Sequence, residues 1–75
     1  MTAEQFDNDL RKLLRARPFQ PFLIVFEDGR TLYIDEPAIA FDNGGGGFID
    51  KEELVHFFEC EEVGEFRPAT KELAQ

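Results

Sequence analysis

The sequence predicts a small α+β domain in which one N-terminal helix is followed by an antiparallel β-meander of about five short strands. Three observations lead to this fold class. Apolar residues recur at helical spacing near the N-terminus, a continuous apolar run begins at Phe22, and an Asp28-Gly29 pair follows that run. The 75 residues suffice for one domain, which we place at residues 1–68, with a frayed tail at 69–75.

The helix is predicted over about residues 3–16. Thr2 and Gln5 have capping-box spacing, and acidic residues precede basic ones along the segment, as the helix dipole favours. Pro18 ends the helix, because a proline pushes the residue before it out of the α region. The apolar face is formed by positions at i, i+4, i+7 and i+8, namely Phe6, Leu10, Leu13 and Leu14.

The first strand is predicted at 22–26, after a short stiff connector that holds Pro18 and Pro21. Its residues are continuously apolar rather than alternating, which indicates a strand covered on both faces. Asp28-Gly29 predicts a type I′ hairpin turn and a returning strand at 30–34. Glu36-Pro37 interrupts this strand, and 38–41 resumes extended structure.

The second half of the chain allows two interpretations of its secondary structure. We expect a flexible loop at 42–47, because four consecutive glycines lose much conformational entropy in any regular element. Strands are then favoured at about 47–50 and 54–59, with a turn between them, a one-turn element at 60–63 and a last strand at 64–67. The alternative is a second helix near 51–60, which would give a split α-β-α arrangement, since Asp50 and Glu53 also have capping-box spacing.

The net charge of −8 is unevenly distributed along the chain. Residues 1–30 carry five basic and five acidic side chains, so the second half holds the whole excess. An acidic surface repels phosphate backbones, so we expect no nucleic-acid partner, and the plainest interpretation is that the charge keeps a Phe-rich domain in solution. Without a signal peptide or an apolar run of about 20 residues, we expect a cytoplasmic protein with no membrane partner.

One motif points toward a metal. Five positions match the spacing of an EF-hand loop over residues 42–53, and its candidate calcium ligands are Asp42, Asp50 and Glu53. The two positions that normally supply further ligands are Gly44 and Gly46, which have no side chain. Weak calcium binding by this degenerate loop is therefore the alternative function. The main interpretation includes no metal or cofactor.

The residues for catalysis are few. The chain has no Ser and no Trp, and its one Cys, Cys60, lies four residues after its one His, His56. Three neighbouring glutamates disfavour the negatively charged thiolate and so weaken Cys60 as a nucleophile. We therefore expect no enzyme activity, and we interpret Cys60 as a small packed residue.

The segment Arg15-Ala16-Arg17-Pro18-Phe19-Gln20-Pro21-Phe22, together with Asp28-Gly29-Arg30, resembles a group of short bacterial proteins of unknown function. These proteins share an opening helix, an "RPFxPF" connector and a "DGR" hairpin. The resemblance covers about residues 5–35, and more weakly 61–63, and it implies no activity. At the fold level, the element order resembles a small SH3-like or Sm-like barrel. Sm-like proteins bind RNA through basic or polar rims, from which the acidic second half departs.

These observations favour a non-enzymatic protein-interaction or self-association module. Its partner would be an unknown protein or a second copy of the chain. The docking surface would be the acidic face or an exposed aromatic patch drawn from Phe41, Phe48, Phe58 and Phe66.

Overall fold

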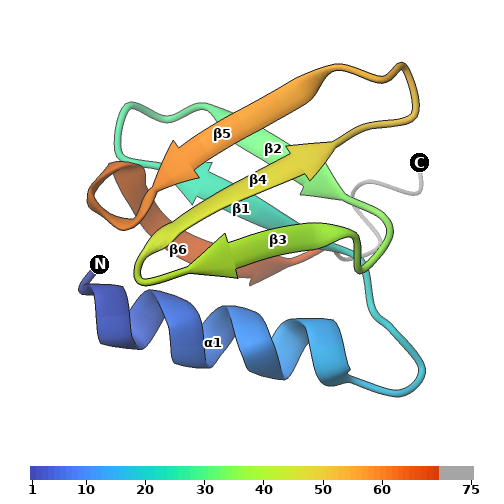
Figure 1. Cartoon of the computed structure of the whole chain (residues 1–75), viewed down its shortest axis with the longest axis horizontal. Helices are drawn as coiled ribbons and strands as arrows, with labels where there is room; N and C mark the ends of the chain where they lie inside the picture. The colour runs from blue at the N-terminus through green and yellow to red at the C-terminus, as the bar shows by residue number, and fades with distance from the viewer. Residues whose placement is uncertain (70–75) are drawn as a thin grey trace.

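The computed structural model describes residues 1–69 and shows one N-terminal helix followed by six antiparallel strands in two three-stranded sheets (Figure 1). This confirms the predicted α+β fold class, with six strands instead of about five. The small SH3-like or Sm-like barrel expected from the element order is not formed, because the strands of residues 1–69 are divided between two sheets and do not close. The predicted frayed tail lies outside the described residues except for Ala69, whose N–H donates to the carbonyl of Pro21 at 3.1 Å.

The elements follow one another without long connections. The helix is α1 (Ala3–Arg15), and a one-turn 3₁₀ helix, η1 (Cys60–Glu62), precedes the last strand. The first sheet has the order β2-β1-β6, and the second has the order β3-β4-β5. The strands are β1 (Phe22–Phe26), β2 (Thr31–Ile34), β3 (Ile39–Asp42), β4 (Gly45–Ile49), β5 (Val55–Glu59) and β6 (Val63–Pro68).

Helix α1 covers one side of the two sheets. In Figure 1 it runs beneath β3 and β6, which belong to different sheets. Its buried residues are Phe6 and Leu10, as the apolar spacing predicted. The ring of Phe6 lies 6.0 Å from that of Phe58 and 5.8 Å from that of Phe66, so one helical side chain contacts both sheets. The core also contains Phe22, Ile24, Ile34, Ile39, Phe48 and Val63.

The helix begins and ends near its predicted residues. The Thr2 hydroxyl oxygen accepts a hydrogen bond from the Gln5 N–H at 3.1 Å, which caps the first turn. Ala16 has left the helix, with ψ at 138°. In the connector, the ring of Phe19 packs edge-on against that of Phe22 at 6.1 Å, so the prolines lead directly into the core strand β1.

The prediction of a type I′ turn at Asp28-Gly29 was wrong. Only Gly29 has a positive φ, at 93°, whereas a type I′ turn requires positive φ at both central residues. The Gly29 N–H donates to the carbonyl of Phe26 at 2.9 Å, which makes a three-residue loop that ends in a left-handed glycine. The Asp28 carboxylate favours this geometry, because it accepts from the backbone N–H and the Nε of Arg30 at 3.0 and 2.7 Å.

The predicted flexible loop at 42–47 was also wrong. Asn43 and Gly44 form a two-residue hairpin turn with φ values of 52° and 86°, and the next three glycines belong to β4. The physical reason is close packing. A Cβ atom at Gly46 would lie 2.8 Å from the ring of Phe58, so only a bare backbone fits there.

The alternative with a second helix near 51–60 is excluded. Residues 51–52 form a turn and 55–59 form strand β5, as the favoured interpretation had it. The turn resembles that of the first hairpin, since Glu53 has a positive φ of 67° and its N–H donates to the carbonyl of Asp50 at 3.0 Å. The one-turn element predicted at 60–63 is confirmed as η1.

Candidate interaction surface

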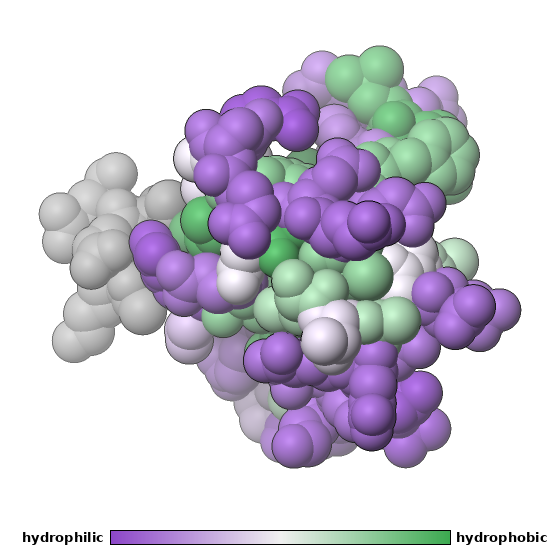
Figure 2. All heavy atoms as spheres, turned by 90° about the vertical axis from the view of Figure 1, so that its left-hand side faces the viewer, coloured by the Kyte–Doolittle hydropathy of each residue, from purple (hydrophilic) through white to green (hydrophobic). Residues whose placement is uncertain are grey.

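The outer face of the β4–β5 hairpin exposes a group of large apolar side chains. Phe57 is 83% exposed and Val55 is 52% exposed. Ile49 lies directly opposite Val55 in the β4–β5 register, and Leu54 lies in the adjoining turn. We call Ile49, Leu54, Val55 and Phe57 the hairpin patch. In Figure 2 one group of hydrophobic surface lies at the upper right, and hydrophilic surface covers the upper left and most of the lower part.

Glycines form the floor beside the patch. Gly47 pairs with Ala40 on β3 and with Phe57 on β5. In this row of three residues across the sheet, Phe57 is the one large residue. A Cβ at Gly47 would lie 3.3 Å from the Phe57 ring, which shows that the ring borders the glycine directly. The result is a shallow hollow of about 440 Å³ on the outer face of the sheet. With no larger neighbour to cover it, Phe57 faces solvent.

A second hollow lies between the two sheets, on the side opposite α1. It measures about 390 Å³ and is lined by β2 and β5, with Leu32 on one side and His56 and Phe57 on the other. Phe26, Arg30, Thr31 and Glu62 complete its walls. The side chain of Phe57 thus borders both hollows, one on the outer face and one between the sheets.

The turn before β5 is fixed by Asp50. One carboxylate oxygen accepts from the backbone N–H groups of Glu52 and Leu54 at 2.8 and 3.0 Å. The other oxygen lies 2.8 Å from Nε2 of His56, which is half-exposed on β5. The hydrogen bond with His56, followed by those from the two amides, holds the pKa of the Asp50 carboxyl below its usual value. Asp50 therefore stays charged at neutral pH and orders the turn.

The three candidate calcium ligands are not brought together. Asp42 ends β3 and pairs with Gly45 at the start of β4, whereas Asp50 follows the other end of β4. A five-residue strand separates them by about 17 Å along its axis. Glu53 lies in the same turn as Asp50, but the Asp50 oxygens already bind two amides and His56. Within residues 1–69, no three His, Cys, Asp or Glu side chains are grouped to hold a metal ion.

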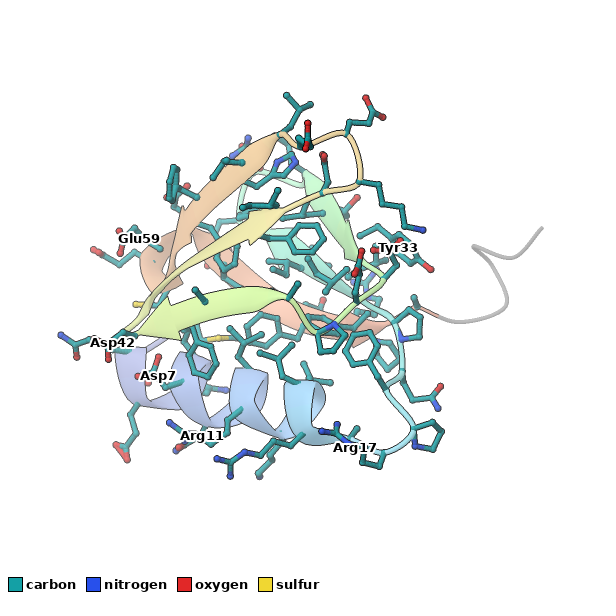
Figure 3. The ribbon with its side chains drawn as sticks, turned by 45° about the vertical axis from the view of Figure 1, so that its right-hand side comes forward. Asp7, Arg11, Arg17, Tyr33, Asp42 and Glu59 are labelled. Carbon is teal, nitrogen blue, oxygen red and sulfur yellow. The ribbon has the colours of Figure 1, made fainter. Side chains whose placement is uncertain are left out.

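In the β3-β4-β5 sheet, the acidic residues that end β3 and β5, Asp42 and Glu59, lie at the same end of the molecule. Figure 3 shows Asp42, Glu59 and Asp7 at this end and Tyr33 at the other.

Two charged side chains of α1 make packing contacts. The Asp7 carboxylate accepts a hydrogen bond from the Gly44 N–H at 3.0 Å. On the helix, the Arg11 guanidinium donates to Asn8 at 3.2 Å and lies 5.9 Å from the ring of Phe41. These contacts give Arg11 a packing role.

Cys60 and His56 do not form a catalytic pair. Cys60 packs against the core, and its sulfur would lie 3.0 Å from a Cβ at Gly44, near the start of α1. His56 is turned to Asp50 at the other end of β5. The interpretation of Cys60 as a packed residue is therefore confirmed.

The aromatic patch suggested from the sequence used the wrong residues. Phe48 and Phe58 are buried, and Phe41 and Phe66 are half-buried against the core. The exposed ring belongs to Phe57. The signal was present in the sequence, because adjacent residues of a strand face opposite sides, so burial of Phe58 forces Phe57 outward.

No helix within residues 1–69 has the length and apolar character needed to cross a membrane. Comparisons of the chain with protein-family models, curated proteins and solved structures found no match.

Proposed function

We propose that this domain is a non-enzymatic protein-interaction module that binds through the hairpin patch. The observation that carries the proposal is the 83% exposure of Phe57 on β5. Val55 on the same strand and Ile49 opposite it on β4 are also more than half exposed. Large aromatic side chains dominate the energetics of protein interfaces when they are buried by a partner. Contiguous apolar surface rimmed by polar residues is typical of interaction sites.

The rigidity of the scaffold supports the same proposal. The patch lies on a hairpin whose turn is held by Asp50 and whose inner side chains, Phe48 and Phe58, are buried. The Lys51 ammonium lies 2.9 Å from the Asp35 carboxylate, which ties this turn to the segment that follows β2. A partner would therefore meet a preformed surface and would lose little entropy in ordering it.

The test is quantitative affinity capture with the whole chain and two variants. Phe57→Ser removes the exposed ring, and Tyr33→Ser is the matched control, since Tyr33 is a half-exposed aromatic residue on the other sheet. We expect partners that are lost with Phe57→Ser and kept with Tyr33→Ser. Sedimentation velocity over a range of concentrations detects self-association of the same variants. A strict monomer with no partner dependent on Phe57 would overturn the proposal.

A further inference from the structure

The outer edge of β5 has no partner strand within residues 1–69, because β5 is the last strand of the β3-β4-β5 sheet. Its hydrogen-bonding direction follows from the register. The Asp50 N–H donates to the carbonyl of Leu54 at 3.0 Å, and the Cys60 N–H donates to the carbonyl of Gly44 at 2.6 Å, at the two ends of the ladder. In an antiparallel pair such bonding positions alternate, so even-numbered residues of β5 bond to β4.

The odd-numbered residues therefore direct their N–H and C=O groups away from β4. We call the outward backbone groups of Val55, Phe57 and Glu59 the β5 edge. Each of these residues is exposed, and two of them belong to the hairpin patch. The backbone hydrogen-bonding groups and the apolar side chains thus occur on the same three-residue stretch.

Of the other three edge strands, β3 and β6 are protected in ways that β5 is not, and β2 lines the hollow that it shares with β5. Strand β3 lies against α1, where the Arg11 guanidinium covers the ring of Phe41. Strand β6 ends at Pro68, and its first carbonyl, that of Val63, accepts from the N-terminal ammonium of Met1 at 3.5 Å. Covering elements and proline are common means of blocking edge pairing. Strand β5 has neither.

Both ends of β5 are acidic, whereas its middle is not. The carboxylates before the strand are those of Asp50, Glu52 and Glu53, and those at its end or just after it are Glu59, Glu61 and Glu62. Between residues 31 and 66 the one Lys or Arg is Lys51, whose ammonium lies 2.9 Å from the Asp35 carboxylate. An occupant with basic residues at both ends would complement this charge.

We propose that the β5 edge accepts an extended peptide segment with an apolar middle and basic ends as an added strand of the β3-β4-β5 sheet. This proposal rests on the proposed function and names its partner class. Main-chain hydrogen bonds to the β5 edge supply affinity, as in other strand-addition complexes. Alternate side chains of the added strand pack on Phe57 and Val55, and the others face the 390 Å³ hollow between β2 and β5.

A second copy of the chain is the poorer occupant. In the antiparallel register that puts Phe57 opposite Phe57 of the copy, the acidic turn before β5 (Glu52, Glu53) would lie beside the acidic segment after β5 (Glu61, Glu62) of the other copy. Like charges brought together in this way oppose the pairing. The total charge of −8 on each copy adds to this repulsion.

The test uses two synthetic peptides that differ only in their charged ends. The first is Lys-Lys-Val-Thr-Val-Thr-Val-Lys-Lys, and the second replaces each lysine with glutamate. Each is titrated into the ¹⁵N-labelled whole chain. We expect the lysine peptide to shift the amide resonances of Val55, Phe57 and Glu59, with an affinity more than about tenfold above that of the glutamate peptide. The affinity should fall as salt is added.

Two blocked forms, the protein variant Phe57→Pro and an N-methylated lysine peptide, test whether binding uses the backbone of the β5 edge. Phe57→Pro removes one outward N–H and leaves the bonds between β4 and β5 in place, whereas Phe57→Ala keeps that N–H. We expect Phe57→Pro to abolish the shifts at Val55 and Glu59, and Phe57→Ala to weaken binding severalfold. A lysine peptide N-methylated at alternate backbone nitrogens blocks the edge from the peptide side and leaves the protein unchanged, so it should also fail to bind.

Lysine-peptide binding that survives both blocked forms, or equal binding of the two unmodified peptides, would overturn the proposed edge. The proposed edge would also be overturned if neither peptide bound and sedimentation showed a dimer that Phe57→Ser dissociates. That last result would sustain the proposed function with a second copy as partner, so the two proposals fail separately.

Discussion

Within strand β4, Gly46 is the glycine that depends most directly on the absence of a side chain. A Cβ there would lie 2.8 and 3.0 Å from two atoms of the Phe58 ring, and that ring is buried among core residues. The neighbouring Gly45 differs, because its nearest atoms would be the carboxylate oxygens of Glu59, at 3.2 and 3.5 Å. An exposed carboxylate can move away, whereas a buried ring cannot.

We expect Gly46→Ala to lower the free energy of unfolding by about 1–3 kcal/mol, the usual effect of overpacking a core. Gly45→Ala is the matched control and should change it by less than about 0.5 kcal/mol. Urea denaturation followed by circular dichroism measures both. Equal effects of the two substitutions would contradict the role given to the Phe58 ring.

Asp50 is the residue whose titration should be visible in stability. The hydrogen bond with His56, then those from the amides of Leu54 and Glu52, lower the pKa of its carboxyl in the folded state from the ordinary value of 3.8. A depressed folded pKa adds stability that is fully present above the unfolded pKa. That stability is lost as the pH falls through the lower folded pKa.

We therefore expect Asp50→Ala to reduce Tm at about pH 7, and the difference from the unmodified chain to shrink below about pH 4. Asp50→Asn keeps an oxygen that can accept from the amides but loses the charge facing His56, so its Tm should lie between the other two at neutral pH. Thermal unfolding at several pH values measures this. A Tm difference that stays constant down to pH values below the ordinary carboxyl pKa would contradict the assignment.

At the scale of elements, local signals predicted the helix, the central strand and the turn before β6. These depend on caps, prolines and continuous apolar runs, which act within a few residues. The glycine strand could not be predicted in this way, because its order comes from the rings of Phe57 and Phe58 on the next strand. The Asn43-Gly44 hairpin was predictable, since Asn-Gly is a strong type I′ signal, but it was obscured by the glycines that follow.

The candidate surface likewise depends on contacts between strands and not on local signals. Which aromatic residue is exposed depends on strand parity, and a shift of one residue in register reverses it. The sequence indicated a Phe-rich interaction patch without resolving this parity for Phe57 and Phe58. The pairing of Phe57 with Gly47, which leaves its ring uncovered, is a tertiary feature.

Helix α1 is attached to the second sheet by one polar contact as well as by its apolar face. The Gly44 N–H in the β3–β4 turn donates to the half-buried Asp7 carboxylate at 3.0 Å. We expect Asp7→Ala to lower the free energy of unfolding by about 1–2 kcal/mol, because the turn amide loses a charged acceptor. Asn8→Ala is the control, since Asn8 is exposed and gains similar helix propensity.

Hydrogen exchange provides a second measurement of this contact. The Gly44 amide should exchange faster in Asp7→Ala than in Asn8→Ala, because its acceptor is gone in the first variant alone. Unchanged exchange at Gly44 would mean that the contact contributes little to the attachment of α1.

At the scale of the whole molecule, an acidic sheet surface is held on a compact core with a radius of gyration of 11.7 Å. The screening length of about 10 Å in 0.1 M salt is similar to this radius, so carboxylates across the second half still repel one another. Within residues 1–69, Arg30, Lys51 and Arg67 form ion pairs with Asp28, Asp35 and Glu65, and none of these pairs uses the glutamates at positions 52, 53, 59, 61 or 62. Among the described residues these glutamates therefore have no ion-pair partner.

We expect Tm to rise when sodium chloride is increased from about 0.1 M to about 1 M, because the screening length falls to about 3 Å and the repulsion with it. The double variant Glu61→Gln/Glu62→Gln should have a higher Tm at low salt and a smaller rise. Glu4→Gln is the matched control, since Glu4 lies in the first turn of α1, where a negative charge is favourable. A Tm that is independent of salt, or an equal rise in all three chains, would show that the acidic surface does not oppose folding.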